Sequence, residues 1–219
     1  MKMNISTATK VVPIAAIMML SACKTADVYT ADSFADFQTT HKQVAVLPFE
    51  VTIGQKDLPE GTDLAALKFA EEEEGKVFQK QLYSQFLKRW SKGEYTVEFQ
   101  DVDETNVLLR RANMADENIE NFTKAEIGQA LGVDAVISGN IKRDKPMSTG
   151  AAVASVVLLG FGGATNSVNV NMTVHDAEAG SLLWSYDHEI KGGLGSSAEG
   201  VAKSLMKNSS KKFPYKKEQ

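Results

Sequence analysis

The feature that most limits how this chain can fold is a pair of alternating segments near its C-terminal end, separated by a short turn. Residues 168–175 (VNVNMTVH) place apolar side chains at every second position and polar side chains between them. Since successive residues of a strand point to opposite faces, this pattern predicts a half-buried strand. Residues 176–180 (DAEAG) have turn chemistry, with Gly180 where a left-handed backbone is needed, and residues 182–190 return as the partner strand. The chain is therefore expected to contain a hairpin with one polar face.

The first half of the chain predicts two further strands and two helices. Residues 43–49 (QVAVLPF) form a short apolar run, and Pro48 should end its ladder pairing because proline lacks a backbone N–H. Residues 62–90 carry apolar side chains in one stripe at helical spacing, which predicts a long amphipathic helix. Residues 95–100 alternate as a strand does, and residues 103–112 follow as a short helix.

The second half adds a tight connection between a helix and a strand. Residues 123–126 (TKAE) form a capping box, and the helix that they open stops at Gly132, immediately before a strand at residues 133–141. A second capping box at residues 196–199 (SSAE) opens a closing helix after the hairpin. The element order β-α-β-α-α-β-β-β-α predicts an α/β fold with a single domain, in which helices pack on a mixed β-sheet and a C-terminal β-hairpin is followed by a helix.

The N-terminus carries an export signal that ends at the only cysteine of the chain, Cys23. Residues 11–20 (VVPIAAIMML) are apolar, but a membrane-spanning helix needs roughly 20 such residues, so residues 1–22 are interpreted as a signal peptide. Residues 20–23 (LSAC) resemble a bacterial lipobox, where the cysteine is acylated and the chain is cleaved in front of it. The alternative is a free cysteine in an ordinary signal peptide, but no A-x-A cleavage site is obvious nearby. We therefore expect Cys23 to be lipidated.

Lipidation predicts where the mature protein is located. A diacylglycerol on the thiol and an amide-linked acyl chain, palmitate among them, anchor a protein stably, whereas one chain binds a membrane only marginally. Lys24 follows the cysteine, while lipoproteins of enteric bacteria that resemble this one are usually retained at the inner membrane by aspartate in that place. The expected location is the periplasmic face of the outer membrane.

The mature chain is expected to be acidic and to contain one binding domain. Lys2 and Lys10 leave with the signal peptide, so 22 of the 24 basic residues remain against 28 acidic residues, a formal charge of −6. This charge argues against a nucleic-acid partner. Residues 23–42 are interpreted as the lipidated N-terminus and a polar tether, residues 43–215 as an α/β binding domain, and residues 216–219 as a polar tail.

Two short motifs look like chemical sites without satisfying their requirements. Residues 71–74 are four consecutive glutamates, but consecutive residues point around a helix and cannot converge on one ion, so they are interpreted as a solvated or frayed helix face. Residues 193–198 (GLGSSA) fit the dinucleotide pattern G-x-G-x-x-A. That site also needs a further strand and an acidic residue about 20 positions on, so a helix entry capped by Ser196 is favoured.

The histidines also give no sign of a catalytic or metal site. His41, His175 and His188 lie at no recognised metal-ligand spacing, and His175 belongs to the polar face of its strand. Neither a G-x-S-x-G elbow nor an H-E-x-x-H motif occurs, and Cys23 is assigned to lipid. We therefore expect a protein without enzyme activity, metal or cofactor. An enzyme would need a site assembled from residues that are far apart in the sequence.

Three segments together resemble a group of bacterial lipoproteins. Residues 44–49 (VAVLPF), 127–141 (IGQALGVDAVISGNI) and 168–187 (VNVNMTVHDAEAGSLLWSYD) are similar to the curli-type secretion-channel lipoproteins, the penicillin-binding-protein activator lipoproteins and the N-terminal domain of the Tol-system propeller protein. The resemblance covers roughly residues 43–207. It implies a binding or assembly module without an active site, and its motifs specify architecture better than function.

One apolar segment, residues 148–166, stands out because glycines interrupt it and it lies between two compact strands. Residues 151–161 match the roughly 9 to 11 residues of a transmembrane strand, and the resemblance to curli-type channels implies membrane-piercing hairpins. Both faces of the segment are apolar, however, whereas a pore strand presents polar residues to its lumen. A buried extension of the sheet, or a patch for self-association or partner binding, explains the same composition and is favoured. The candidate interaction or membrane residues are Val153, Val157, Leu159 and Phe161.

These patterns lead to one functional hypothesis and one alternative. The chain is expected to be a lipid-anchored, periplasm-facing lipoprotein that acts as a non-enzymatic binding or assembly factor for a cell-envelope complex. Its partner is expected to be an envelope protein or a second copy of the chain. The alternative is a subunit of an oligomeric outer-membrane secretion channel of the curli type.

Overall fold

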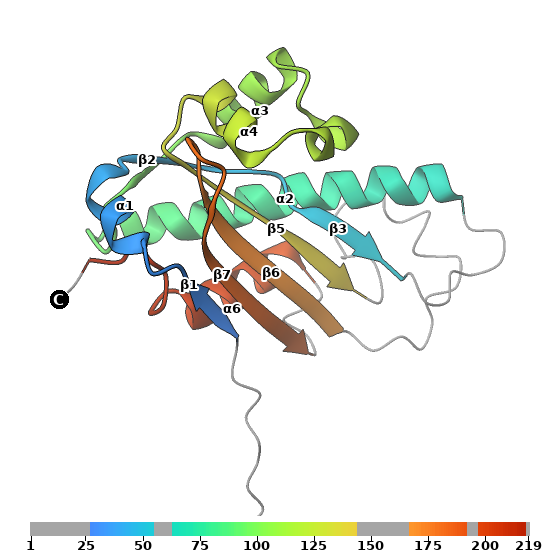
Figure 1. Cartoon of the computed structure of the whole chain (residues 1–219). Coiled ribbons are helices and arrows are strands. Elements are labelled where there is room, and N and C mark those ends of the chain that lie inside the picture. Colours follow the sequence, from blue (N-terminus) through green and yellow to red (C-terminus); the bar gives the residue numbers. More distant parts are fainter. Residues whose placement is uncertain (1–26, 55–62, 144–166, 192–196, 218–219) are drawn as a thin grey trace, which may run out of the picture.

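The computed structural model describes residues 27–54, 63–143, 167–191 and 197–217 (Figure 1). Within these residues, seven strands form one mixed sheet in the order β1-β7-β6-β5-β2-β4, and β3 also pairs with β5. The strands are β1 (Val28–Thr30), β2 (Gln43–Val46), β3 (Glu50–Ile53), β4 (Glu98–Phe99), β5 (Ala135–Arg143), β6 (Ser167–Asp176) and β7 (Leu182–Lys191). The helices are α1 (Phe34–Thr40), α2 (Leu64–Trp90), α3 (Val102–Arg111), the 3-10 helix η1 (Asp116–Asn121), α4 (Lys124–Leu131) and α6 (Ala198–Ser209). The expected single α/β domain with a mixed sheet is confirmed.

The hairpin that the sequence predicts is the best-paired part of the sheet. Strands β6 and β7 run antiparallel, with Met172 opposite Tyr186 and Val174 opposite Trp184. Gly180 in the turn has a φ of 69°, the left-handed conformation that glycine adopts without steric cost. The helix α4 likewise begins with the predicted capping box and ends at Gly132, whose φ is also 69°. The predicted hairpin turn at Gly180 and the predicted caps of α4 are therefore both confirmed.

Helices cover the two faces of the sheet unequally. Figure 1 shows α2 and α6 behind the sheet and α3 and α4 at its upper end. The larger core cluster joins alternate residues of the strands, such as Val44, Val46 and Ile137, to Phe78 and Leu82 of α2. The smaller cluster uses the opposite face of the same strands. Its buried residues are Ala45, Leu47, Leu109, Ile127, Leu131, Val133 and Val136. The rest of this second face carries the polar residues of β6, which agrees with the alternation in its sequence.

Pro48 interrupts a strand that then continues. The predicted strand at residues 43–49 is observed as β2, which pairs in parallel with β5 and places Val46 opposite Ile137. After Pro48, β3 pairs with the same strand and places Glu50 opposite Asn140. The three residues between Val46 and Glu50 therefore face two residues of β5, which is the one-residue excess of a β-bulge. The strand β3 was not predicted from the sequence, because it is only four residues long and directly follows Pro48 and Phe49, although its residues EVTI alternate between polar and apolar.

The N-terminal boundary of the domain differs from the expectation. Residues 23–42 were interpreted as a tether, but β1 pairs antiparallel with β7, and α1 packs against the domain. Phe34 of α1 is buried, and its ring lies edge-on to Tyr215 with the centroids 5.2 Å apart. The polar composition of this segment hid these contacts, since only a few of its side chains face the core. The folded unit therefore includes residues 28–40, which the tether interpretation had left out of it.

Two other expected elements are shorter or shifted. The strand expected at residues 95–100 is only two residues long as β4, because Tyr95 bridges to Lys216 and the Thr96 N–H donates to the carbonyl of Tyr215. The N-cap of the last helix lies one residue later than predicted. Ser197 is the N-cap and accepts a hydrogen bond from the Gly200 N–H, while Ser196 lies outside the described residues.

Candidate functional site

Several residues singled out from the sequence lie outside the part of the chain that the structure describes. They are Cys23, Val153, Val157, Leu159 and Phe161, together with most of the glycine-rich loop at residues 193–198. Their assignments remain predictions. In the described ranges, no helix combines the length and the apolar character that crossing a bilayer requires.

The described residues enclose a pocket of about 560 Å³ on the polar face of the sheet. Its floor comes from β5 and β6, and its walls come from β3, the first half of α2, and the segment from α3 to the start of α4. This volume falls within the roughly 300–1,000 Å³ typical of small-molecule sites. The apolar part of the lining is Leu47, Pro48, Phe49, Val51, Leu109, Ala115 and Ile119. The pocket can therefore receive a ligand with both apolar and polar surface.

The floor of the pocket is a set of hydroxyl, amide and imidazole groups on neighbouring strands. Ser138 Oγ of β5 lies 3.0 Å from Thr173 Oγ1 of β6, so the two hydroxyls are hydrogen-bonded to each other. Asn171 donates to Asp187 Oδ1 at 3.0 Å on β7. His175 lies beside them, and burial together with the nearby Lys124 ammonium lowers its pKa to about 4. The His175 ring is therefore neutral at neutral pH.

The hypothesis that residues 71–74 form a solvated or frayed helix face is wrong for two of the four glutamates. Glu74 is only 2% exposed, and its Oε2 lies 3.7 Å from Nη1 of the equally buried Arg143 on β5. Glu71 Oε1 accepts a hydrogen bond from the Ile53 N–H at 2.8 Å, and burial raises the pKa of the Glu71 carboxyl. Glu73, in contrast, forms a half-exposed ion pair with Lys76 at 3.0 Å.

Glu74 is buried and Glu71 is partly buried because β3 and the end of β5 pack against this turn of α2. The carboxylates nevertheless point in different directions, as four successive helical residues must. Glu71 and Glu72 line the pocket, whereas Glu74 is held by Arg143 inside the protein. In the described residues, no group of three or more histidine, cysteine or acidic side chains has an arrangement that could hold a metal ion.

The wall formed by α3 and α4 contributes two cationic groups to the pocket. Arg110 lies in the last turn of α3, and Lys124 is the first residue of α4. Burial lowers the pKa of Lys124, and the carboxylate of Glu50 on β3 acts in the opposite direction. No ion pair within 4.0 Å joins Arg110 or Lys124 to another described residue. A desolvated ammonium without a close counter-ion is unusual in a protein and marks this wall as a candidate binding surface.

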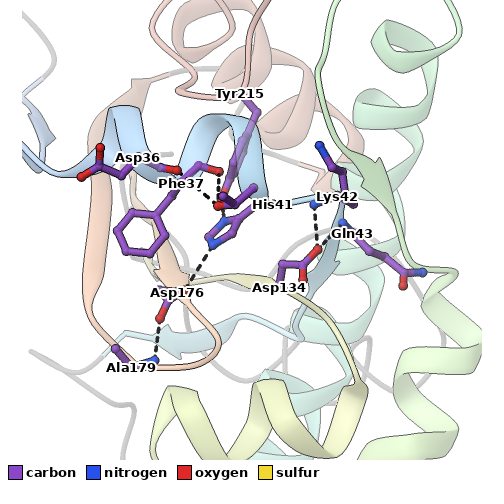
Figure 2. Close-up of polar contacts among 10 residues, drawn as sticks. Asp36, Phe37, His41, Lys42, Gln43, Asp134, Asp176, Ala179 and Tyr215 are labelled. Atoms are coloured by element: carbon purple, nitrogen blue, oxygen red, sulfur yellow. Dashed lines mark hydrogen bonds and ion pairs between the residues drawn. The ribbon is translucent and has the colours of Figure 1, made fainter.

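A second polar cluster lies inside the domain, and Figure 2 shows its contacts. His41 Nε2 is 3.1 Å from Asp176 Oδ1, and His41 Nδ1 is 2.6 Å from the hydroxyl of Tyr215. Both hydrogen bonds are satisfied when Nε2–H donates to Asp176 Oδ1 and the hydroxyl of Tyr215 donates to Nδ1. The second carboxylate oxygen of Asp176 accepts from the N–H of Ala179 in the hairpin turn.

The geometry of this cluster resembles a catalytic triad, but its surroundings are structural. His41, Asp176 and Tyr215 are 5%, 3% and 0% exposed, and the pocket lining includes none of them. Burial, with Asp176 and Asp134 nearby, raises the pKa of the Tyr215 hydroxyl, which makes it a poor nucleophile at neutral pH. The cluster instead ties the end of α1, the hairpin turn and the C-terminal segment together. The sequence could not show it, because His41 and Asp176 are 135 positions apart.

Comparison with protein families and with curated proteins gives no match. Among solved structures, the PelC dodecamer from Paraburkholderia phytofirmans is 16% identical, with a TM-score of 0.43, over 89% of this chain and 99% of that chain. Lipoprotein GNA1162 from Neisseria meningitidis is 14% identical, with a TM-score of 0.42, over 78% of this chain and 95% of that chain. The LpoB C-terminal domain from Salmonella enterica is 10% identical, with a TM-score of 0.35, over 69% and 84%. These values describe a loose likeness of fold, which assigns no function.

Proposed function

We propose that this chain is a lipid-anchored lipoprotein on the periplasmic face of the outer membrane, and that its domain binds a component of a cell-envelope complex without catalysing a reaction. The observation that carries the anchoring is the lipobox-like sequence LSAC, which ends at the only cysteine. Lys24 in the next position supports the outer membrane as its location. The observation that supports binding is the mixed polar and apolar pocket on the open face of the sheet.

The absence of catalysis is part of the same proposal and is supported by the contacts of the pocket side chains. A nucleophilic hydroxyl needs a base within hydrogen-bond reach. Among the described residues, Ser138 and Thr173 bond to each other and neither bonds to His175. The one His–Asp–Tyr arrangement that the described ranges contain is closed to substrate. These arrangements suit a site that holds a ligand better than one that transforms it.

Anchoring is tested by changing the cysteine. Cys23→Ala should remove acyl labelling with an alkyne-tagged palmitate analogue and release the protein from the membrane fraction, because no residue then carries the diacylglycerol. The unchanged protein should sediment with the outer membrane in a sucrose gradient, and Lys24→Arg serves as the matched control. A Cys23→Ala protein that stays labelled would refute the lipobox interpretation.

Binding through the pocket is tested by photo-crosslinking in intact cells. A photoreactive residue replaces Lys68, which is exposed at the pocket, or Lys88, which is exposed near the other end of α2. The proposal expects a discrete adduct from position 68 and none from position 88, with the adduct identified by mass spectrometry. The same adducts from both positions, or no adduct from position 68, would contradict it.

A further inference from the structure

The cationic wall of the pocket suggests the chemistry of the ligand, an inference that rests on the proposed binding function. The pocket is lined by four basic residues, and two of them have partners close by. Lys76 pairs with Glu73 at 3.0 Å, and Lys68 also interacts with its surroundings. The other two, Arg110 and Lys124, form no ion pair within 4.0 Å with any residue in the described ranges. The unsatisfied positive charge of the pocket is therefore concentrated on one wall.

The surroundings of Lys124 favour the arrival of an anion. The side chain is half-buried, and desolvation destabilises its charged form, which lowers its pKa. Glu50 attracts it from β3 but not at ion-pair distance. His175, which lies near it, is neutral, so the ring can meet an anion only through its single N–H donor and Lys124 supplies the positive charge. His175 Nδ1 is also buried without a hydrogen-bond partner among the described residues. An anion at Lys124 would restore the missing counter-charge in a partly desolvated place, where such contacts are strong.

The rest of the lining limits what else the ligand can carry. Leu109 adjoins Arg110 on α3, and Ile119 follows on η1, so apolar surface lies next to the cationic wall. The carboxylates of Glu50, Glu71 and Glu72 line other walls of the pocket. Glu120 of η1 lies on the same wall as Arg110. These four groups would repel a second negative charge. We propose that Arg110 and Lys124 form an anion subsite that binds a single carboxylate attached to an apolar body.

The test uses the full-length lipoprotein in detergent micelles and N-acetyl-leucine as the probe. The imidazole resonance of His175, assigned by its loss in His175→Gln, reports binding by NMR. N-acetyl-leucine should shift this resonance saturably. N-acetyl-leucinamide, which has the same apolar body without the charge, should bind at least about tenfold more weakly. Inorganic phosphate is the third arm, and tighter binding of phosphate than of N-acetyl-leucine would overturn the choice of a carboxylate.

Variants then assign the subsite to its residues. Lys124→Gln and Arg110→Gln should each weaken binding of N-acetyl-leucine by about tenfold, because each removes one charge-assisted hydrogen bond. Lys124→Arg keeps the charge and should restore most of the affinity, while Lys88→Gln, which removes an exposed charge elsewhere, should leave it unchanged. Arg110 is exposed, so its variant should fold in any case.

Three outcomes would overturn the subsite. The first is equal binding of the acid and the amide, and the second is unaltered binding of N-acetyl-leucine by Lys124→Gln and Arg110→Gln. The third is that no probe shifts the His175 resonance. The proposed function would fail separately, through persistent acylation of Cys23→Ala or through missing crosslinks at position 68. The two experiments therefore distinguish a wrong ligand class from a wrong function.

Discussion

Glu74 and Arg143 illustrate how residue roles in this protein depend on what covers each side chain. Both side chains are almost completely buried, one on α2 and the other at the end of β5. Removing one partner of a buried ion pair typically costs about 3–5 kcal/mol, since the other charge stays behind without compensation. The pair therefore links α2 to the end of β5, inside the sheet between β3 and β6. Glu71 and Glu72, three and two positions before Glu74, instead line the pocket.

His175 gives a prediction for the pH dependence of stability. Its pKa is about 4 in the folded protein, against an ordinary value of 6.5. Between these values the unfolded chain binds a proton that the folded chain does not, so stability is present above pH 6.5 and is lost as the pH falls toward 4. At 1.36 kcal/mol per pKa unit, the full loss is roughly 3 kcal/mol.

The comparison that isolates this residue is urea unfolding of the full-length protein and of His175→Gln at pH 7.5 and pH 4, followed by tryptophan fluorescence. Other groups titrate in both proteins, so the difference between them reports His175. On acidification, the free energy of unfolding should fall by roughly 3 kcal/mol less in the variant than in the original protein. If the free energy of unfolding falls equally in both proteins, His175 is protonated as easily in the folded state as in the unfolded one.

At the scale of elements, β7 and the C-terminal segment stabilise each other through aromatic side chains. Trp184 is 0% exposed, stacks on Tyr186 with ring centroids 5.7 Å apart, and meets Phe213 edge-on at 5.7 Å. Phe213 also packs against Phe86 of α2 at 5.1 Å. The segment after α6 thereby closes one end of the core between the sheet and the long helix. This explains why the C-terminal residues fold although their sequence is mostly polar.

Trp184→Ala is expected to destabilise the domain by about 3–5 kcal/mol, because it leaves a large cavity in this cluster. For a domain of this size that corresponds to a fall in melting temperature of roughly 10 °C. Trp90→Ala is the matched control, since Trp90 is 42% exposed and its removal should change the melting temperature little. Circular dichroism melting of the full-length proteins in micelles measures both. Equal shifts for the two variants would show that packing at Trp184 is not the cause.

At the scale of the whole molecule, the early start of the fold brings the domain close to its expected anchor. Val28 begins β1 only five positions after Cys23, and an extended chain covers at most roughly 3.6 Å per residue, so the separation is below about 20 Å. The expected tether up to residue 42 would have allowed a far longer reach. The His41 cluster then fixes α1 to the hairpin turn and to the C-terminal segment. A lipidated protein with this short linker would hold its domain near the membrane surface.

The double variant Val157→Asp and Leu159→Asp discriminates among the roles considered for residues 148–166. If these side chains form an interaction patch, the protein should stay folded and lose its partner or its self-association, because a charge on an exposed surface costs the fold little. If they belong to the core, burial of unpaired carboxylates costs several kcal/mol, and the protein should unfold. If the segment enters the membrane, as in the alternative channel function, the protein should fold but lose conductance.

Circular dichroism, light scattering and bilayer conductance on the same preparation separate these results. Val157→Ala with Leu159→Ala is the control, since it shortens the side chains without adding charge. A folded charged variant with unchanged size, crosslinking and conductance would remove every functional role assigned to the segment.

Local chemistry along the chain determined the hairpin, α4 with its capping box and left-handed Gly132, and the long helix. Each of these depends on neighbours within one turn, one strand or one motif, so the order of residues is sufficient to predict it. Only the tertiary structure decided that β3 resumes pairing after Pro48, that α1 belongs to the domain, and that Glu74 is buried. It also created the His41 cluster and the pocket, which join side chains more than 100 positions apart in the sequence. Periodicity reports which face of a segment is buried but not which segment buries it, and for that reason the pocket could not be predicted from the sequence alone.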